Sequence, residues 1–163
     1  AVIATDIPAE EQGTGMLFNM DGEVVGVISS SVWNDTGKNV VNAYGISDLK
    51  PIIELLINGK SVPYIGIYGT TVTEQLAEEH KMPSGIYVAD VDPDSPAMAA
   101  GIQIGDIICE ASGEEIKDIA AYQNIVIGSS VGETMEFVGK RLGSDGYVNI
   151  KFSVVTTEKE EVK

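Results

Sequence analysis

The sequence contains few of the residues that build disulfides or metal sites. Among its 163 residues there is one cysteine, Cys109, and one histidine, His80, so an internal disulfide and a cysteine–histidine zinc site are both excluded. Cys109 lies in a strand-like apolar run, which indicates a buried thiol rather than a reactive one. We therefore expect neither a metal site nor a cofactor.

Long apolar runs are also missing. No stretch approaches the ~20 apolar residues that a membrane-spanning helix needs, and no signal-peptide pattern opens the sequence. Because the first residue is Ala1 and not an initiator methionine, we expect the chain to be a fragment of a longer protein.

Basic residues are scarce, since 10 Lys and Arg stand against 25 Asp and Glu, for a formal net charge of −15. Nucleic acid and anionic lipid are poor partners for such a chain. The acidic residues are spread along the sequence, except in the short charged tail 158–163, which we expect to be frayed. The hydrophobic content of 44% is enough for one ordinary domain or two small ones.

Residues 1–62 are predicted to form a β-rich unit. An apolar run at 15–19 and a β-branched run at 24–28 flank an Asp-Gly turn signal, which is typical of a hairpin. A helix is expected from the N-cap Ser47 to the stop signal at Asn58–Gly59, with apolar residues at helical spacing along one buried face. The residues that follow, up to Pro63, are a linker.

Residues 63–157 are predicted to form a second unit of short strands and helices. Two of its boundaries are clearest, because Thr71 or Thr73 can cap the first helix and Asp118 the last. The expected elements, in chain order, are a strand at 67–70, a helix at 73–80, a strand at 85–91, a helical turn at 97–100, a strand at 102–110, a helix at 118–127, and a hairpin of 133–142 with 147–155.

Four motifs in the second unit follow the order and spacing of a PDZ domain. They are Tyr-Ile-Gly-Ile at 64–67, Ser-Pro-Ala-Met-Ala-Ala-Gly-Ile at 95–102, Gly-Asp-Ile-Ile at 105–108 and Ser-Gly-Glu-Glu-Ile at 112–116. The unit therefore resembles the PDZ domain of the HtrA serine protease family. This resemblance implies a mainly β, α+β fold: a PDZ-type, partly open β-barrel with two helices.

The loop and helix of this unit suit the binding of a peptide end. Backbone N–H groups of the 64–67 loop can receive a C-terminal carboxylate, and glycine at position 66 permits close approach. The peptide would pair with the 67–70 strand as an added strand, and the 119–127 helix would form the other wall. The expected peptide-binding residues are Tyr64, Ile65, Gly66, Ile67, Tyr68, Ile119, Tyr122, Gln123 and Val126.

Three of these residues, Ile65, Ile67 and Val126, are expected to line a pocket for an apolar terminal side chain. The alternative is that the same residues only build the core of a small α/β barrel, because a side chain cannot face a groove and a core equally.

Residues 1–62 also resemble the HtrA family, as the end of its trypsin-like β-barrel. The matching segments are 5–6, 13–19, 21–27 and 45–49. Where the family has its nucleophile in Gly-Asn-Ser-Gly-Gly-Pro-Leu, this chain has Gly13, which carries no hydroxyl. The family's His and Asp would lie before Ala1. We therefore predict no catalytic residue in this chain, and Thr14 is a nucleophile only if the alignment shifts by one position.

The leading interpretation is a PDZ module of an HtrA-like serine protease, or of a non-catalytic relative (a pseudoprotease), that captures peptide C-termini or unfolded segments by strand addition. One alternative is part of an active serine-type endopeptidase in protein quality control. Another is an assembly or regulatory contact in a homo-oligomer. The resemblance implies an extracytoplasmic place in a bacterial cell envelope. Half a β-barrel leaves sheet edges open, so we expect residues 1–62 to dimerise or rearrange.

Overall fold

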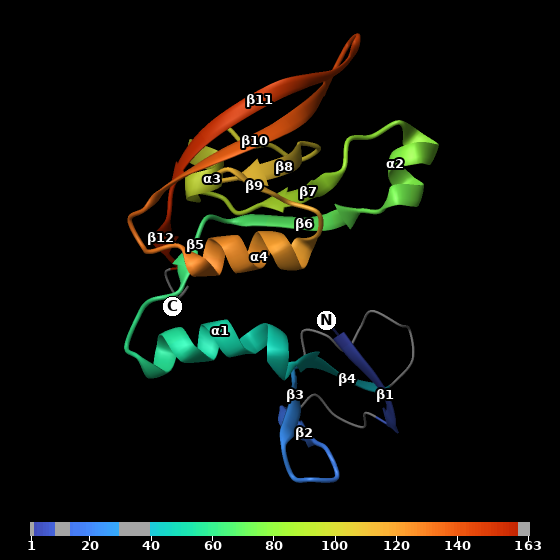
Figure 1. Ribbon diagram of the computed structural model, residues 1–163, viewed down its shortest axis with the longest axis vertical. Coiled ribbons are helices and arrows are strands. Elements are labelled where there is room, and N and C mark those ends of the chain that lie inside the picture. The colour runs from blue at the N-terminus through green and yellow to red at the C-terminus, as the bar shows by residue number, and fades with distance from the viewer. Residues whose placement is uncertain (1, 9–13, 30–39, 160–163) are drawn as a thin grey trace. The chain divides into compact units, whose positions relative to one another are not determined.

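The computed structural model describes residues 2–8, 14–29 and 40–159. Figure 1 shows the chain by element, and the chain divides into two compact units, Ala1–Asn58 and Gly59–Lys163. The division comes four residues before the boundary expected from the sequence. No helix in the described part of the chain is both long and apolar enough to cross a bilayer.

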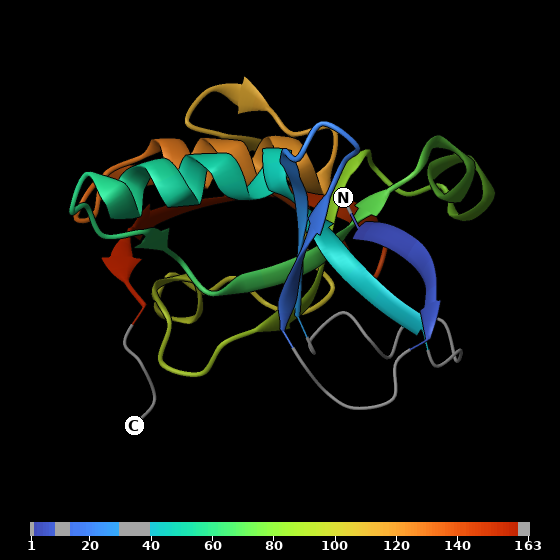
Figure 2. The same ribbon diagram turned by 90° about the horizontal axis from the view of Figure 1, so that it is seen from below.

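The first unit is one antiparallel sheet followed by a helix. Its strands are β1 (Val2–Pro8), β2 (Gly15–Phe18), β3 (Val24–Ile28) and β4 (Val40–Gly45), in the spatial order β1-β4-β3-β2. Figure 2 shows the β2–β3 hairpin lying beside the β1–β4 pair. The predicted hairpin is therefore confirmed, and β1 and β2 are the end strands of this sheet.

Helix α1 (Ile46–Ile57) begins earlier than the sequence indicated. Gly45, and not Ser47, is the N-cap residue, and no side chain caps the helix. The cause is that strand β4 runs directly into the helix, which places Ser47 inside the first turn. The expected stop is confirmed, because Asn58 is the C-cap and its N–H donates to the Glu54 carbonyl at 3.2 Å. No described residue of α1 is fully buried, although the helix packs against β3 and β4.

The second unit is built on an antiparallel sheet of the order β11-β10-β8-β7-β6, with β9 paired to β8. A separate two-stranded pair, β5 with β12, joins the start of the unit to its end. The strands are β5 (Pro63–Tyr64), β6 (Ile67–Val72), β7 (Gly85–Val91), β8 (Ile107–Ala111), β9 (Glu114–Glu115), β10 (Thr134–Gly143), β11 (Gly146–Val155) and β12 (Thr157–Glu158).

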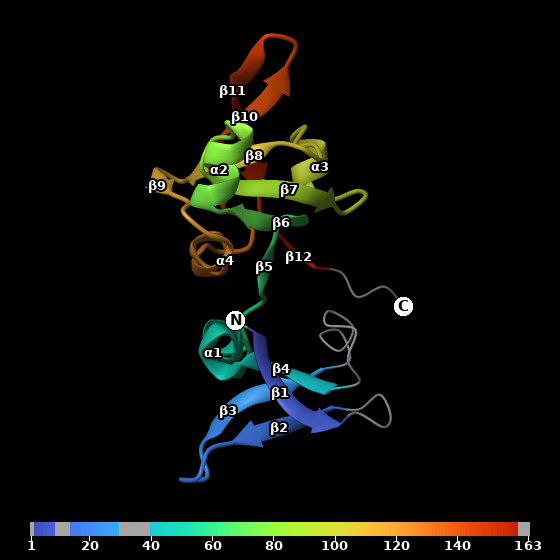
Figure 3. The same cartoon turned by 90° about the vertical axis from the view of Figure 1, so that its right-hand side faces the viewer.

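Three short helices complete the unit, each begun by a side-chain cap. They are α2 (Glu74–His80), α3 (Pro96–Ala99) and α4 (Ile119–Gly128). Thr73 accepts a hydrogen bond from Leu76 N–H, and Asp118 accepts one from Ala121 N–H at 2.7 Å, as N-caps do. In Figures 1 and 3, α4 lies along β6 on the side opposite β7. The chain is therefore mainly β with short helices, as predicted.

Two expectations for the second unit are wrong in detail. The strand predicted at 102–110, with Gly105–Asp106 as its entry turn, begins only at Ile107. The turn itself is present, since Gly105 has φ +92° and Gln103 N–H donates to the Asp106 carboxylate at 2.9 Å, and it keeps the residues before Ile107 out of the strand. The charged tail expected at 158–163 begins inside β12, since Glu158 pairs with Pro63. Residues 160–163 lie outside the described part of the chain.

A single apolar cluster forms the core of the second unit. It combines residues from the sheet, α3 and α4, and its most enclosed members include Ile86, Ile108 and Phe137, each 0% exposed. Beside it, the carboxylate of Asp106 is 1% exposed and accepts two hydrogen bonds from Arg141, at 2.6 and 2.8 Å. This ion pair raises the pKa of Arg141 and satisfies a charge that burial alone would penalise.

Candidate functional site

The predicted 64–67 loop is held against the segment that follows β7. The Ile65 carbonyl accepts a hydrogen bond from Ala97 N–H, and the Gly66 carbonyl accepts one from Asp92 N–H, both at 2.9 Å. In a trans peptide, the N–H of the next residue points away from the carbonyl. The N–H groups of Gly66 and Ile67 therefore point away from the 92–97 segment.

Glycine is required at position 66. Its φ is +85°, a region that side chains rarely adopt, and an added Cβ would lie 2.3 Å from Ser95 Cβ and 2.9 Å from Tyr64 Oη. Ser95 itself is fixed, because its hydroxyl accepts a hydrogen bond from Met98 N–H and caps α3. The loop, the 92–95 turn and α3 are thus one packed arrangement.

Strand β6 follows the loop and is the end strand of its sheet. Its inner edge pairs with β7, from Ile67 opposite Val91 to Val72 opposite Gly85. Its other side faces α4, and the two are tied where Ile119 N–H donates to Thr71 Oγ1 at 3.1 Å. The strand and the helix that were predicted to flank a bound peptide are therefore adjacent.

The predicted peptide-binding residues divide into two groups. Ile65, Ile67, Tyr122 and Val126 are 2–8% exposed and belong to the core cluster, with Ile119 partly buried against it. Burial raises the pKa of the Tyr122 hydroxyl. Tyr68 and Gln123 are exposed. The structure thus brings the expected pocket residues together, but as packed side chains of the core.

A polar cluster that the sequence did not predict adjoins the loop, and we call it the Asp92 cluster: Tyr64, Tyr68, Asp92 and Lys159. Asp92 Oδ2 accepts hydrogen bonds from the hydroxyls of Tyr64 and, at 2.8 Å, Tyr68. Lys159 Nζ donates to the Tyr68 hydroxyl at 2.9 Å and lies 3.7 Å from Asp92 Oδ2. It also lies 5.2 and 5.6 Å from the ring centroids of Tyr64 and Tyr68, within cation–π range.

Electrostatics in the Asp92 cluster favours the charged carboxylate and ammonium. The hydrogen bonds from Tyr64 and then Tyr68 lower the pKa of Asp92. The hydrogen bond with Tyr68 raises the pKa of Lys159, with a smaller contribution from Asp92. Burial, followed by the hydrogen bond to Asp92, raises the pKa of Tyr64. The cluster therefore keeps its ion pair over the whole neutral range.

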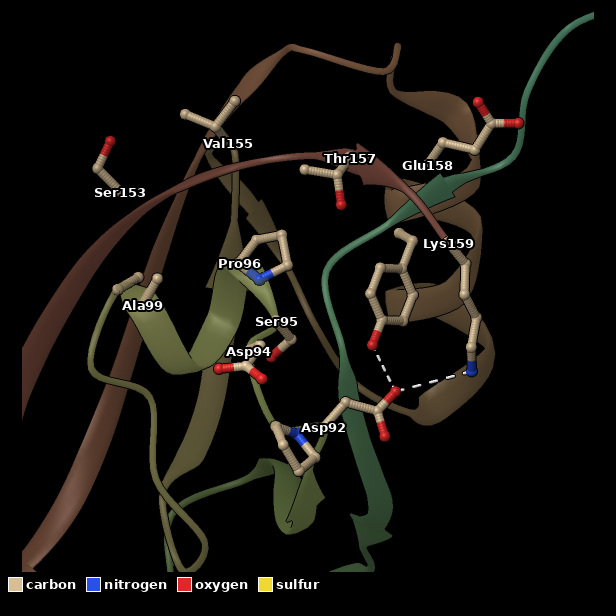
Figure 4. A pocket seen from close by; sticks show the side chains of 13 residues that line it. Asp92, Asp94, Ser95, Pro96, Ala99, Ser153, Val155, Thr157, Glu158 and Lys159 are labelled. Carbon is tan, nitrogen blue, oxygen red and sulfur yellow. Dashed lines mark hydrogen bonds and ion pairs between the residues drawn. The ribbon is translucent and has the colours of Figure 1, made fainter. Parts of the chain in front are cut away.

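A cavity of about 880 Å³ lies beside the Asp92 cluster, between α3, β11 and β12. Figure 4 shows Ala99 and Pro96 on one wall and Val155 and Thr157 on another, with the Asp92–Lys159 ion pair at its edge. The lining residues are Tyr64, Asp92, Pro93, Asp94, Ser95, Pro96, Ala99, Ala100, Ser153, Val155, Thr157, Glu158 and Lys159. No local pattern in the sequence predicts this cavity, because residues far apart in the chain line it.

The candidate nucleophile and the single histidine are each either exposed or outside the described residues. Gly13, at the position of the family's nucleophile, lies outside the described residues, and Thr14 is exposed beside them. His80 is exposed at the end of α2. In the described residues, no group of three or more His, Cys, Asp or Glu side chains is placed to hold a metal ion.

Comparison with known proteins gives a consistent result. The PDZ domain family matches residues 87–141. A probable periplasmic DegP-like serine endoprotease of Halomonas elongata is 30% identical over 155 residues, which cover 91% of this chain and 32% of the relative. The Do-like serine protease HtrA of Bacillus subtilis is 30% identical over 174 residues, covering 98% of this chain and 38% of the relative. This chain thus spans about a third of their length.

A solved structure shows the same fold. The HtrA-type protease AlgW, solved with a decapeptide, aligns with a TM-score of 0.57 and 21% identity, over 91% of this chain and 46% of that one. At this identity the likeness establishes the arrangement of the elements.

Proposed function

Because this chain carries a PDZ domain and is related to the HtrA serine endoproteases, we propose that its Gly59–Lys163 unit binds peptide C-termini and extended unfolded segments by strand addition along β6. The main observation behind the proposal is the orientation of the backbone in the loop before β6. The carbonyls of Ile65 and Gly66 are bonded to the 92–97 segment, so the N–H groups of Gly66 and Ile67 point the other way.

The surroundings of the loop support the same binding mode. β6 is an end strand, so its outer edge can pair with a peptide backbone, and α4 stands beside that edge. Tyr68, Ile119 and Gln123 are the expected side-chain contacts. A terminal apolar side chain would insert between α4 and the loop, where it requires Ile65, Ile67 and Val126 to move apart, because these residues are packed in the unbound protein.

The test is a titration of this chain with short peptides that carry a free or an amidated C-terminus. We expect binding that amidation weakens at least tenfold, since an amide cannot replace a carboxylate at the loop N–H groups. A third peptide, N-methylated at one backbone amide, removes a hydrogen bond of the added strand and controls for side-chain binding. Amide chemical-shift changes should map to 66–71 and 119–123. Equal affinity for acid and amide, or shifts confined to β11, would contradict the proposal.

The first unit supports a proposal about the parent protein. The matches to the relatives extend over 91% and 98% of this chain, so they include residues of the Ala1–Asn58 unit. We propose that this unit is the end of a trypsin-like domain, which an extracytoplasmic protein of the bacterial envelope would carry. Since Gly13 stands where the family has serine, the parent should resist labelling by a serine-directed phosphonate. Stoichiometric labelling would show that an active nucleophile is present.

A further inference from the structure

The end of the second unit returns to the peptide loop. Thr157 of β12 pairs with Tyr64, and Glu158 pairs with Pro63, so β12 lies directly beside the start of the loop. We call the segment Thr157–Lys159 the C-terminal strap. Its last residue is Lys159, whose ammonium group donates a hydrogen bond to the hydroxyl of Tyr68, the second residue of β6. The same ammonium group forms an ion pair with Asp92. The strap therefore contacts both the first residue of the 64–67 loop, Tyr64, and the residue that follows the loop, Tyr68.

Through Asp92, the strap is also linked to the backbone hydrogen bonds that orient the loop. Asp92 accepts hydrogen bonds from both tyrosine hydroxyls, and its own N–H donates to the Gly66 carbonyl at 2.9 Å. One residue thus links the side-chain cluster to the peptide group that directs the Ile67 N–H. A shift of Asp92 would turn that N–H with it.

The cavity makes the polar contacts of Tyr64 important for holding its side chain in place. Tyr64 lines a cavity of about 880 Å³, so part of its side chain borders open space instead of packed atoms. Apolar contacts fix a buried side chain from all sides, whereas a ring beside a cavity keeps freedom to move. The position of Tyr64 is restrained instead by the hydrogen bond from its hydroxyl to Asp92 and by the Lys159 ammonium group over its ring.

We propose that the C-terminal strap positions the peptide-binding loop, with Lys159 and Asp92 as positioning residues. The inference rests on the proposed peptide-binding function and adds a determinant outside the predicted site. Lys159 needs no contact with the ligand in this role. It holds Tyr68 and Asp92 together, and through them it sets the direction of the N–H groups that receive the peptide carboxylate.

The experiment compares wild type with three variants of the full chain. Lys159→Met removes the ammonium and keeps most of the side-chain length, and Lys159→Arg restores a cation that can bond to Asp92 and stack on the tyrosines. Lys151→Met is the matched control, because Lys151 is an exposed lysine on β11 outside the cluster. Thermal unfolding of each variant checks that the fold is unchanged.

The first readout is hydrogen exchange at two amides, Asp92 N–H and Ala97 N–H, which donate to the loop carbonyls. We expect about fivefold faster exchange in Lys159→Met, the size expected for losing a surface ion pair with its cation–π contacts. Exchange in Lys159→Arg and Lys151→Met should equal that of wild type. Equal exchange in Lys159→Met and wild type would overturn the inference, whatever the peptide result.

The second readout is affinity for a peptide with a free C-terminus. We expect Lys159→Met to bind about fivefold more weakly, with Lys159→Arg near wild type. Faster exchange with unchanged affinity would overturn the positioning role. If wild type itself binds no free C-terminus, the proposed function fails, and the exchange data alone then decide whether the strap holds the loop.

Discussion

Replacing Gly66 with alanine tests the packing that defines the loop. At φ +85°, an alanine costs about 1–2 kcal/mol in backbone conformation. The new Cβ would also lie 2.3 Å from Ser95 Cβ and 2.6 Å from Ser95 Oγ, closer than atoms can approach. Ser95 cannot yield freely because it is 3% exposed and caps α3, so overpacking adds about 1–3 kcal/mol. We expect Gly66→Ala to destabilise the second unit by about 3 kcal/mol.

A second glycine separates the two contributions. Gly113 has φ +84°, nearly the same as Gly66, but no atom lies within 4 Å of an added Cβ. Gly113→Ala should therefore cost only the conformational part, about 1–2 kcal/mol. Urea unfolding followed by circular dichroism measures both variants, and Gly66→Ala should lower the Tm by about 15 °C. If the two variants lose the same stability, the contact with Ser95 does not constrain the loop, and the reasoning is refuted.

Three further predictions concern charged and ionisable groups. Arg141→Met should destabilise the protein by about 3 kcal/mol in urea unfolding, because it leaves the buried Asp106 carboxylate unpaired, whereas Lys151→Met should change stability by less than about 0.5 kcal/mol. Asp92→Asn should be less stable than wild type at neutral pH. That difference should shrink as the pH falls below 3.8, because the lowered pKa of Asp92 means that its contribution is present above 3.8 and is lost on protonation. A stability difference that does not change between pH 7 and pH 2 would contradict this assignment. Cys109 should react with iodoacetamide at least tenfold more slowly in the folded protein than in denaturant, because burial raises its thiol pKa above 9.0; equal rates would show an open thiol.

Local patterns in the sequence predicted most of the elements. The α2 and α4 helices begin where Thr73 and Asp118 can cap them, and the β10–β11 hairpin spans the expected residues. These features depend on neighbours within a few residues, so a single sequence contains them. Prediction was wrong where a neighbouring element changed a boundary, as when β4 ran directly into α1 and moved its start before Ser47.

The candidate site also combines features that local sequence patterns predict with features that only tertiary contacts decide. The sequence by itself determined the Tyr-Ile-Gly-Ile loop, the strand after it and the helix that flanks it, because each is a local motif with a known physical use. Only the tertiary structure decided that Ile65, Ile67 and Val126 pack in the core, that Ser95 excludes any side chain at Gly66, and that Lys159 reaches Tyr68 across 91 positions of the chain. Contacts between residues so distant depend on how the sheet and the β5–β12 pair close the chain, and no local pattern encodes that closure.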